Sequence, residues 1–312
     1  MIGFLFPGQG SQVVGMGADL AAAFPTARAT FEEADHVLGW ALSRLMQEGP
    51  AEELTATANA QPALLAHSVA CLRVLAELGA APGMVAGHSL GEWSACVAAA
   101  ALDFPTALRL VRARGQFMAE AALRQGGGMA AILGLEEPQV RALCTQAQEV
   151  GLVRVANSNA PGQVVVSGEE AAVDRACALA KESGAKGAVR LRVSGPFHTP
   201  LMAEAQERLA GELAAAEVAD AHVPLVSNVD ARARTSGSEI RRALTEQVTG
   251  TVRWQECVHA MAAAGVDRFA EVGPGNVLAG LLRRLAPGVP CWAAGTAETI
   301  RETAEQLRSE TP

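Results

Sequence analysis

One serine lies between two glycines where a short apolar segment runs into an alanine-rich one, and this feature most constrains how the chain can fold. The segment reads Val85-Ala86-Gly87-His88-Ser89-Leu90-Gly91-Glu92-Trp93. Glycine at both flanking positions removes the Cβ atoms that would clash in a sharp strand-to-helix turn. A helix predicted from Trp93 to Ala101 directs its free N–H groups and positive dipole end toward Ser89. The pattern predicts a nucleophile elbow, although in a glycine-rich chain a plain turn carries the same letters by chance.

Length, charge and composition indicate a globular enzyme. The 312 residues are 50% hydrophobic, enough to bury a large core in one domain or two. A formal net charge of −8 argues against a nucleic-acid binder and against general affinity for anionic membranes. The N-terminus MIGFLFPGQG has no basic residues, and no stretch approaches the roughly 18 uninterrupted apolar residues of a membrane span. We expect a cytoplasmic monomer that binds neither nucleic acid nor membrane.

The sequence gives no sign of a metal or a bound cofactor. Its six cysteines form no C-x-x-C pair, so we expect buried free thiols at Cys71, Cys96, Cys144, Cys177, Cys257 and Cys291. No G-x-G-x-x-G opens a helix after the first strand, and no G-x-x-x-x-G-K-S/T loop is present. We therefore expect neither a dinucleotide nor a nucleoside triphosphate site.

The order of predicted elements indicates an α/β fold with an insertion. A strand over Ile2–Phe6 ends in a glycine-rich loop, as expected where an α/β sheet keeps its ligand crevice. Helices are predicted over 16–23, 25–38, 60–78 and 106–122. After residue 193 the pattern gives helices over 200–217, 240–248, 254–264 and 298–309, and strands over 224–227 and 268–271.

The middle of the chain has a different pattern of predicted elements. After Gly126-Gly127-Gly128, strands over 129–133, 152–157, 163–167 and 188–192 alternate with helices over 138–148 and 169–183. This βαββαβ order over about 65 residues is the ferredoxin-like plan. We expect a large α/β-hydrolase-like domain, residues 1–125 and 193–312, with an inserted small ferredoxin-like domain, residues 126–192.

A nucleophilic serine needs a base, and among the six histidines His198 has the most suggestive setting. It lies in Ser194-Gly195-Pro196-Phe197-His198-Thr199-Pro200, where two prolines and a glycine restrict the backbone. A lone loop histidine is otherwise commonly a surface residue. His88 adjoins the nucleophile, but neighbours on a sharp turn point apart, so we expect it to support the elbow. His67 lies on a helix face, and we expect it in the core.

A serine thioesterase or esterase of the α/β-hydrolase type is the alternative function. That fold orders its triad as Ser, then Asp or Glu, then His. Asp230 and His259 follow Ser89 in this order, yet neither lies in a convincing strand-end loop. A transferase benefits from lacking a strongly activated triad, because its acyl-enzyme must wait for a thiol while water is kept out.

Five motifs, in order, resemble the landmarks of the malonyl-CoA:acyl-carrier-protein transacylases, a family shared by type II fatty-acid synthesis and polyketide acyltransferase domains. They are Phe6-Pro7-Gly8-Gln9-Gly10-Ser11-Gln12, Gly87-His88-Ser89-Leu90-Gly91-Glu92, Arg114-Gly115-Gln116-Phe117-Met118, Gly195-Pro196-Phe197-His198, and Gln247 with Val252-Arg253-Trp254. The resemblance covers essentially the whole chain. Trp93 stands where tyrosine is commoner in the family, and it keeps a large ring.

The resemblance implies a two-step, ping-pong transfer. Ser89 takes malonyl from malonyl-CoA, and the phosphopantetheine thiol of an acyl carrier protein then takes it from Ser89. His198 is implied as the base, oriented by a backbone carbonyl, that of Gln247, in place of an acid. The N–H groups of Gln9 and Leu90 are implied as the oxyanion hole. Coenzyme A enters as a thioester substrate, so the reaction needs no cofactor.

The resemblance also implies how the acyl group is read. Arg114 holds the free carboxylate of malonate through paired N–H donors, although the residues alone do not choose it over Arg109 or Arg112 on the same predicted helix. Phe197, beside the base, fills the space into which a 2-methyl substituent would project, or else simply packs in the core. The resemblance places Gln247 with Arg114 and Phe197 among the residues that bind the substrate.

Partner and pathway are less constrained by the sequence. Acyl carrier proteins are typically acidic, which makes Lys181, Lys186, Arg190 and Arg192 candidates for docking, although an ordinary solvated surface explains them equally well. Intact Ser89, His198 and Arg114 argue against a catalytically silent subunit. The residues do not separate a fatty-acid enzyme from a polyketide acyltransferase or a malonate-decarboxylase subunit.

Overall fold

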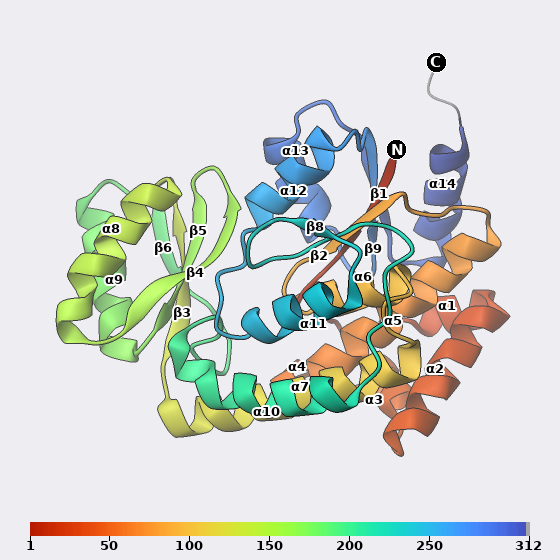
Figure 1. Cartoon of the computed structure of the whole chain (residues 1–312), viewed down its shortest axis with the longest axis horizontal. Helices are drawn as coiled ribbons and strands as arrows, with labels where there is room; N and C mark the ends of the chain where they lie inside the picture. The colour runs from red at the N-terminus through yellow and green to blue at the C-terminus, as the bar shows by residue number, and fades with distance from the viewer. Residues whose placement is uncertain (310–312) are drawn as a thin grey trace.

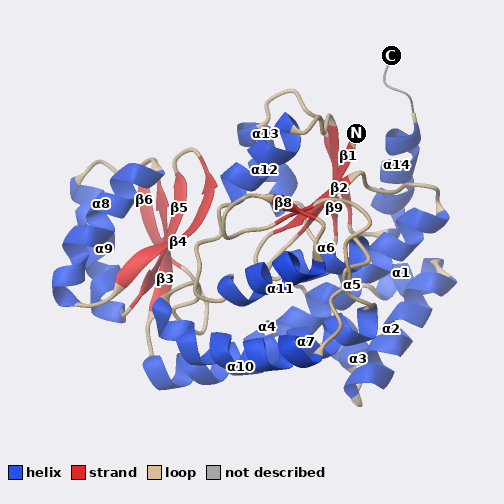
Figure 2. Ribbon diagram, viewed as in Figure 1, coloured by secondary structure: helices blue, strands red, loops and turns tan. Residues whose placement is uncertain are grey.

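The computed structural model describes residues 1–309, and it contains a six-stranded sheet and, beside it, a four-stranded one (Figure 1). Helices cover both sheets, as the colouring by secondary structure in Figure 2 shows. The predicted α/β fold with a parallel sheet and a smaller antiparallel one is confirmed. Within the described residues, no helix is both long and apolar enough to cross a bilayer.

The larger sheet is parallel apart from one edge strand. Its order is β10-β9-β1-β2-β7-β8, and only β8 runs antiparallel to its neighbour. In the register of β1 with β2, Phe6 pairs with Gly87, so the loops that follow these two strands leave the sheet side by side. The strands are β1 (Ile2–Phe6), β2 (Met84–Gly87), β7 (Leu225–Val226), β8 (Ala233–Arg234), β9 (Arg268–Val272) and β10 (Cys291–Ala294).

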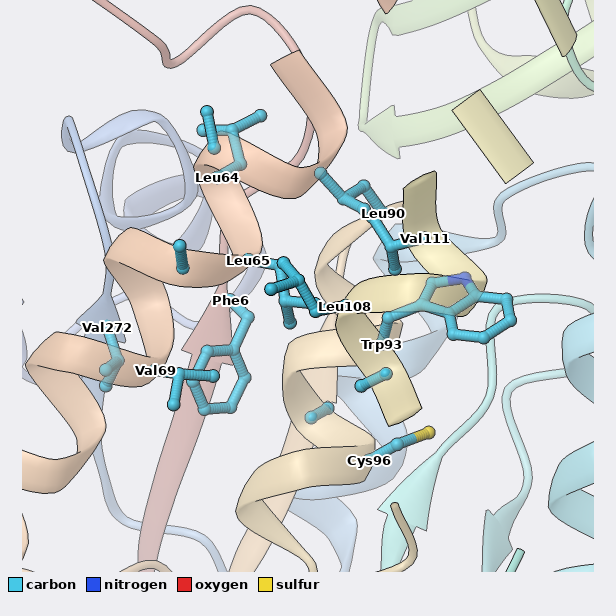
Figure 3. Close-up of a cluster of buried hydrophobic side chains, with 14 of the residues drawn as sticks. Phe6, Leu64, Leu65, Val69, Leu90, Trp93, Cys96, Leu108, Val111 and Val272 are labelled. Carbon is cyan, nitrogen blue, oxygen red and sulfur yellow. The ribbon is translucent and has the colours of Figure 1, made fainter. Parts of the chain in front are cut away.

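Alternate residues of the larger sheet face two separate hydrophobic cores. Phe4 and Phe6 pack in one cluster with residues of the long helices that flank the elbow, whereas Leu5 packs in another with residues of the later helices. Figure 3 shows Leu90 and Trp93, from the elbow, within the first cluster. The helices of this region are α1 (Ala18–Ala23), α2 (Pro25–Leu38), α3 (Leu42–Glu48), α4 (Ala51–Thr55), α5 (Thr57–Glu77), α6 (Gly91–Ala98), α7 (Phe104–Gln125), α10 (Ala203–Ala215), α11 (Gly237–Glu246), α12 (Trp254–Ala263), α13 (Val277–Leu285) and α14 (Ala297–Arg308).

The smaller sheet is antiparallel throughout and follows the predicted βαββαβ order. Its strand order is β4-β5-β3-β6, and residues of α8 and α9 pack on it in a hydrophobic core of their own (Figure 2). Backbone hydrogen bonds between Val252 and the strand β4 join this sheet to the rest of the molecule. The domain boundaries at residues 126 and 192 stay a prediction. The elements are β3 (Gly128–Leu133), β4 (Val153–Ala160), β5 (Gln163–Gly168), β6 (Gly187–Arg190), α8 (Glu137–Ala147) and α9 (Glu170–Glu182).

Several short elements are absent from the sequence-based prediction. The helices α3, α4 and α13 and the strands β8 and β10 each span fewer than ten residues, too few for a clear periodicity. The helix α7 begins two residues earlier than predicted because the Asp103 carboxylate accepts a hydrogen bond from the Thr106 N–H at 2.7 Å. Pro105 then occupies the first turn, where no N–H partner is needed.

Close backbone contacts at the elbow leave no room for a Cβ atom at Gly87 or Gly91. A Cβ on Gly91 would lie 2.0 Å from the Phe6 carbonyl oxygen, and one on Gly87 would lie 1.9 Å from the Gly91 carbonyl carbon. Neither neighbour is a side chain that can move aside. We expect Gly91→Ala to lower the free energy of unfolding by about 3 kcal/mol or more in urea titrations. Gly211→Ala in α10 is the control: with no atom within 4 Å of its Cβ, it should raise stability by about 0.5–1 kcal/mol. Equal effects would contradict the packing argument.

Candidate active site

Ser89 lies at the turn between β2 and α6, in a backbone conformation that serine does not favour. Its φ is 51°, in the left-handed region that costs a non-glycine residue about 1–3 kcal/mol. The side chain of Asn228, just beyond β7, accepts a hydrogen bond from the Ser89 N–H at 2.7 Å and donates one to the Gly87 carbonyl at 2.8 Å. An amide from a neighbouring strand therefore holds the turn. Sequence reasoning missed Asn228, for which no motif gives a signal.

His198 lies within hydrogen-bonding distance of the serine hydroxyl. Its Nε2 is 2.8 Å from Ser89 Oγ, while its Nδ1 is 2.9 Å from the Gln247 carbonyl oxygen and 3.1 Å from that of Gly250. Carbonyl oxygens only accept, so Nδ1 carries the hydrogen and Nε2 is free to accept the serine proton. The family resemblance predicts the Gln247 carbonyl at this place, whereas no motif points to that of Gly250. Like Ser89, His198 has a left-handed backbone, with φ 61°.

No described acidic side chain hydrogen-bonds the His198 ring. Asp230 and His259, the candidates for a hydrolase-type triad, do not form one with Ser89. Asp230 forms an ion pair with Arg234 at 2.6 Å, and His259 is exposed on α12. Burial, together with the positive charge of Arg114, lowers the pKa of His198 to about 3. The imidazole is therefore neutral, and able to accept a proton, throughout the physiological pH range.

Arg114 comes from the middle of α7 and reaches the serine from the other side. Its Nη2 lies 3.2 Å from Ser89 Oγ and 3.1 Å from Gln247 Oε1, and its Nη1 lies 2.6 Å from Gln61 Oε1. The side chain is only 2% exposed. Burial lowers the pKa of the guanidinium to about 10, so it keeps its charge at neutral pH.

The other two arginines of α7 do not reach the serine. Arg112 donates hydrogen bonds to the Ala58 carbonyl and to Asn59 Oδ1, both at 2.6 Å, and stacks over the Trp40 ring. Arg109 is exposed and contacts only Thr106 among the described side chains. The structure thus singles out Arg114, which the residues alone could not.

The glycine-rich first loop lies directly against the elbow. A Cβ on Gly8 would be 2.6 Å from the His88 carbonyl oxygen, so only glycine allows this approach. The contact brings the Gln9 and Leu90 segments together at the serine. Among the described residues, neither of these two backbone N–H groups donates to a protein acceptor. Both remain available to a ligand oxygen.

A cavity of about 110 Å³ opens over Ser89, and part of its wall is apolar. Phe197 is 5% exposed and forms part of that wall beside His198. A larger hollow, of about 480 Å³, shares Gln9 and Val193 with the cavity and leads away past Arg192. The cavity is lined by Gln9, His88, Ser89, Leu90, Arg114, Met118, Met129, Asn157, Leu191, Val193, Phe197 and His198.

Gln247 lies behind the cavity and does not line it. Its side chain is fully buried, with Nε2 donating to Glu92 Oε2 at 2.6 Å and to the Ser89 carbonyl at 2.9 Å. The side chain contacts Arg114 and is not among the residues that line the cavity, and its expected place around the substrate stays a prediction. Burial raises the pKa of the Glu92 carboxyl to about 7. Sequence reasoning did not assign a function to Glu92 or Gln61.

The structure also places the other histidines, the cysteines and the basic docking candidates that the sequence suggests. His88 Nε2 is 2.9 Å from Asn159 Oδ1 at the base of the elbow, and His67 is buried. All six cysteines are free, and no group of three or more His, Cys, Asp or Glu side chains within residues 1–309 is placed to hold a metal ion. Of the basic docking candidates, Arg190 is already paired with Glu170 and Asp174. Lys181, Lys186 and Arg192 are exposed.

The fold and the comparisons with known proteins define one class of enzyme, the acyltransferases. The chain belongs to the acyl transferase domain family, whose model matches residues 3–309, and this confirms the resemblance seen in the five motifs. It is 47% identical over 310 residues to the malonyl CoA-acyl carrier protein transacylase of Bacillus subtilis, covering 99% of this chain and 98% of that one.

Two further relatives agree. The malonyl CoA-acyl carrier protein transacylase of Escherichia coli strain K12 is 50% identical over 283 residues, covering 90% of this chain and 92% of that protein. A solved complex of a type II polyketide-synthase acyl carrier protein with its malonyl-transacylase matches with a TM-score of 0.95 at 44% identity. That match covers 98% of this chain and 99% of the other.

The lowered pKa of the buried His198 predicts how the reactivity of Ser89 depends on pH. We expect the rate at which phenylmethylsulfonyl fluoride, an uncharged serine reagent, modifies Ser89 to stay level as pH falls, with its inflection well below the ordinary histidine value of about 6.5. The reason is that burial and Arg114 lower the pKa of His198. Arg114→Ala removes a charge that disfavours the imidazolium, so its inflection should move upward. Mass spectrometry of the adduct over a pH series measures both. A wild-type inflection near 6.5 would contradict this account.

Proposed function

We propose that this protein transfers a malonyl group from malonyl-CoA to the phosphopantetheine thiol of an acyl carrier protein, in fatty-acid or polyketide synthesis. The single observation that carries this proposal is the Arg114 guanidinium 3.2 Å from Ser89 Oγ, with His198 Nε2 2.8 Å from the same oxygen. If an acyl group on that oxygen carries a free carboxylate, the carboxylate lies within reach of the Arg114 guanidinium. The names of the relatives support the same reaction.

In the first half-reaction, His198 Nε2 takes the Ser89 proton as Oγ attacks the thioester carbonyl of malonyl-CoA. The negative charge that develops on the carbonyl oxygen is met by the N–H groups of Gln9 and Leu90. The tetrahedral intermediate collapses, the carbon–sulfur bond breaks, and the coenzyme A thiolate takes the proton from the imidazolium. The Gln247 and Gly250 carbonyls stabilise that imidazolium in place of a carboxylate.

In the second half-reaction, the carrier thiol enters where coenzyme A left. His198 takes the thiol proton, the sulfur attacks the malonyl ester, and Ser89 regains its proton as the leaving group. A thiol ionises near pH 8.5, whereas water does so near 15.7. A base with a lowered pKa and no carboxylate partner deprotonates the thiol far more readily than water, which favours transfer over the thioesterase alternative.

Each step uses only side-chain and backbone groups of the chain, so the mechanism includes no metal or bound cofactor. We assign Phe197 the role of limiting space beside the acyl α-carbon, because it walls the cavity next to His198. We also propose the division into a large domain, residues 1–125 and 193–312, and a small domain, residues 126–192. The cytoplasmic location and the monomeric state stay predictions.

Ser89→Ala tests the covalent intermediate. Incubation with malonyl-CoA should add one malonyl group to the wild-type protein in intact-mass spectra and none to the variant, because Ser89 combines the elbow with a base at 2.8 Å. Ser11→Ala, a half-buried serine of the first loop, is the control and should be acylated normally. A malonyl adduct on the folded Ser89→Ala protein would refute the proposed intermediate.

Arg114→Ala tests how the carboxylate is read. The variant should lose about 10- to 100-fold or more in kcat/KM for malonyl-CoA, because a charge-assisted hydrogen bond contributes about 1.5–3 kcal/mol. Acetyl-CoA has no carboxylate and should lose much less, so the preference between the two collapses. Arg112→Ala serves as the control and should keep the wild-type preference. If Arg112→Ala changed the preference and Arg114→Ala did not, the carboxylate would bind at the other arginine.

A further inference from the structure

Gln61 contacts the guanidinium that the proposed function relies on. It projects from α5, is 1% exposed, and its Oε1 accepts a hydrogen bond from Arg114 Nη1 at 2.6 Å. Its Nε2 donates to the sulfur of Met118 at 3.7 Å. Met118 lies one helical turn beyond Arg114 on α7 and lines the cavity over Ser89. With its N–H group directed at the sulfur, the amide presents its oxygen to the arginine.

The other side of the guanidinium is held by a second amide. Gln247 Oε1 accepts from Arg114 Nη2 at 3.1 Å, and its own Nε2 is committed to Glu92 and to the Ser89 carbonyl. Within residues 1–309 the hydrogen-bond partners of Arg114 are Gln61, Gln247 and Ser89, and none of them is a carboxylate. The Glu92 carboxylate acts on the charge of Arg114 from a greater distance, and its Oε2 accepts from Gln247 Nε2 at 2.6 Å. Two neutral oxygens therefore orient this buried cation without neutralising it.

We infer that Gln61 is a specificity-determining positioning residue: its neutral oxygen holds Arg114 beside Ser89 and leaves the positive charge for the free carboxylate of the acyl group. This inference rests on the proposed function. A carboxylate at the same place would hold the guanidinium equally well, but it would compete with the substrate for the charge. Position 61 thereby decides whether the cavity prefers an acidic or a neutral acyl group.

Gln61→Glu provides the main test, since it keeps the shape of the side chain and adds one negative charge. We expect kcat/KM for acylation of Ser89 by malonyl-CoA to fall about 10- to 100-fold, the worth of one charge-assisted contact. The value for acetyl-CoA should change little, so the ratio of the two shifts by the same factor. Rapid-quench mass spectrometry of the acyl-enzyme measures both rates.

Gln61→Met removes the acceptor and adds no charge, with a side chain of similar length. The guanidinium then lacks one of its two amide partners, and we expect a smaller loss that again falls on malonyl-CoA. Thermal unfolding of each variant shows that it is folded. If Gln61→Glu does not fold, Gln61→Met decides the question alone.

Asn59→Asp is the matched control. Asn59 lies two residues from Gln61, and its Oδ1 accepts from Arg112 Nη1 at the same 2.6 Å distance. The substitution adds the same charge beside an arginine that does not reach Ser89, so the malonyl-to-acetyl ratio should equal that of the wild type.

The outcomes separate this inference from the proposed function. An unchanged ratio in both Gln61 variants, with a collapsed ratio in Arg114→Ala, would overturn the role of Gln61 and leave the proposed function intact. Equal slowing of both substrates would also overturn it, because a residue that only supports the fold does not discriminate between them. A wild-type protein that takes no malonyl onto Ser89 would instead refute the proposed function.

Discussion

The contact between the Phe6 carbonyl and the backbone of Gly91 is the constraint on which the active site is built. Two neighbouring parallel strands end at the same level, and the turns that follow them touch through backbone atoms, with no side chain between. Beside this contact, Gln9 and Leu90 line the same cavity. Ser89, in the turn between Gly87 and Gly91, has a left-handed conformation, which Asn228 holds from the next strand. The reactive geometry thus follows from how closely two loops can pack.

A second constraint is the buried positive charge. A guanidinium removed from water needs partners for its N–H groups, and here these are supplied by Gln61, Gln247 and the serine itself. The Arg114 Nε and the Glu92 Oε1 have no partner among the described residues, so the cluster is not fully satisfied in the free enzyme. Charges act more strongly in such a dry site than in water. The same burial lowers the pKa of His198 to about 3. On the proposed function, one desolvated cluster therefore provides both the base and the cation that selects the acyl group.

The sequence predicts those parts of the molecule whose signals are local. The elbow is recognisable because glycine, serine and glycine lie within five residues, and the βαββαβ order because each element is long enough to show its period. His198 stands out through its neighbours Pro196 and Pro200. Arg114 is different: its burial depends on α5 packing against α7, and only the family resemblance selected it over two other arginines of the same helix.

Residues that act across the fold left no local signal. Gln61 meets Arg114 across 53 positions, and Asn228 meets Ser89 across 139. The second carbonyl on the His198 ring, that of Gly250, depends on where the chain turns after α11. The motif that contains Gln247 names the residue without indicating which of its atoms act. Such contacts become visible only when the whole topology is known.

The spread of these residues along the chain has a consequence for biosynthesis. Ser89 is made 109 residues before His198 and 158 residues before Gln247, whose carbonyl accepts a hydrogen bond from the His198 ring. At ordinary rates of translation, roughly 5–20 residues per second, the serine exists for about 8 to 32 s before residue 247 is made. A chain truncated before residue 198 therefore lacks the imidazole that lies 2.8 Å from Ser89 Oγ in the complete fold. On the proposed function, the chemistry needs residues from both halves of the chain, so neither half made alone would support it.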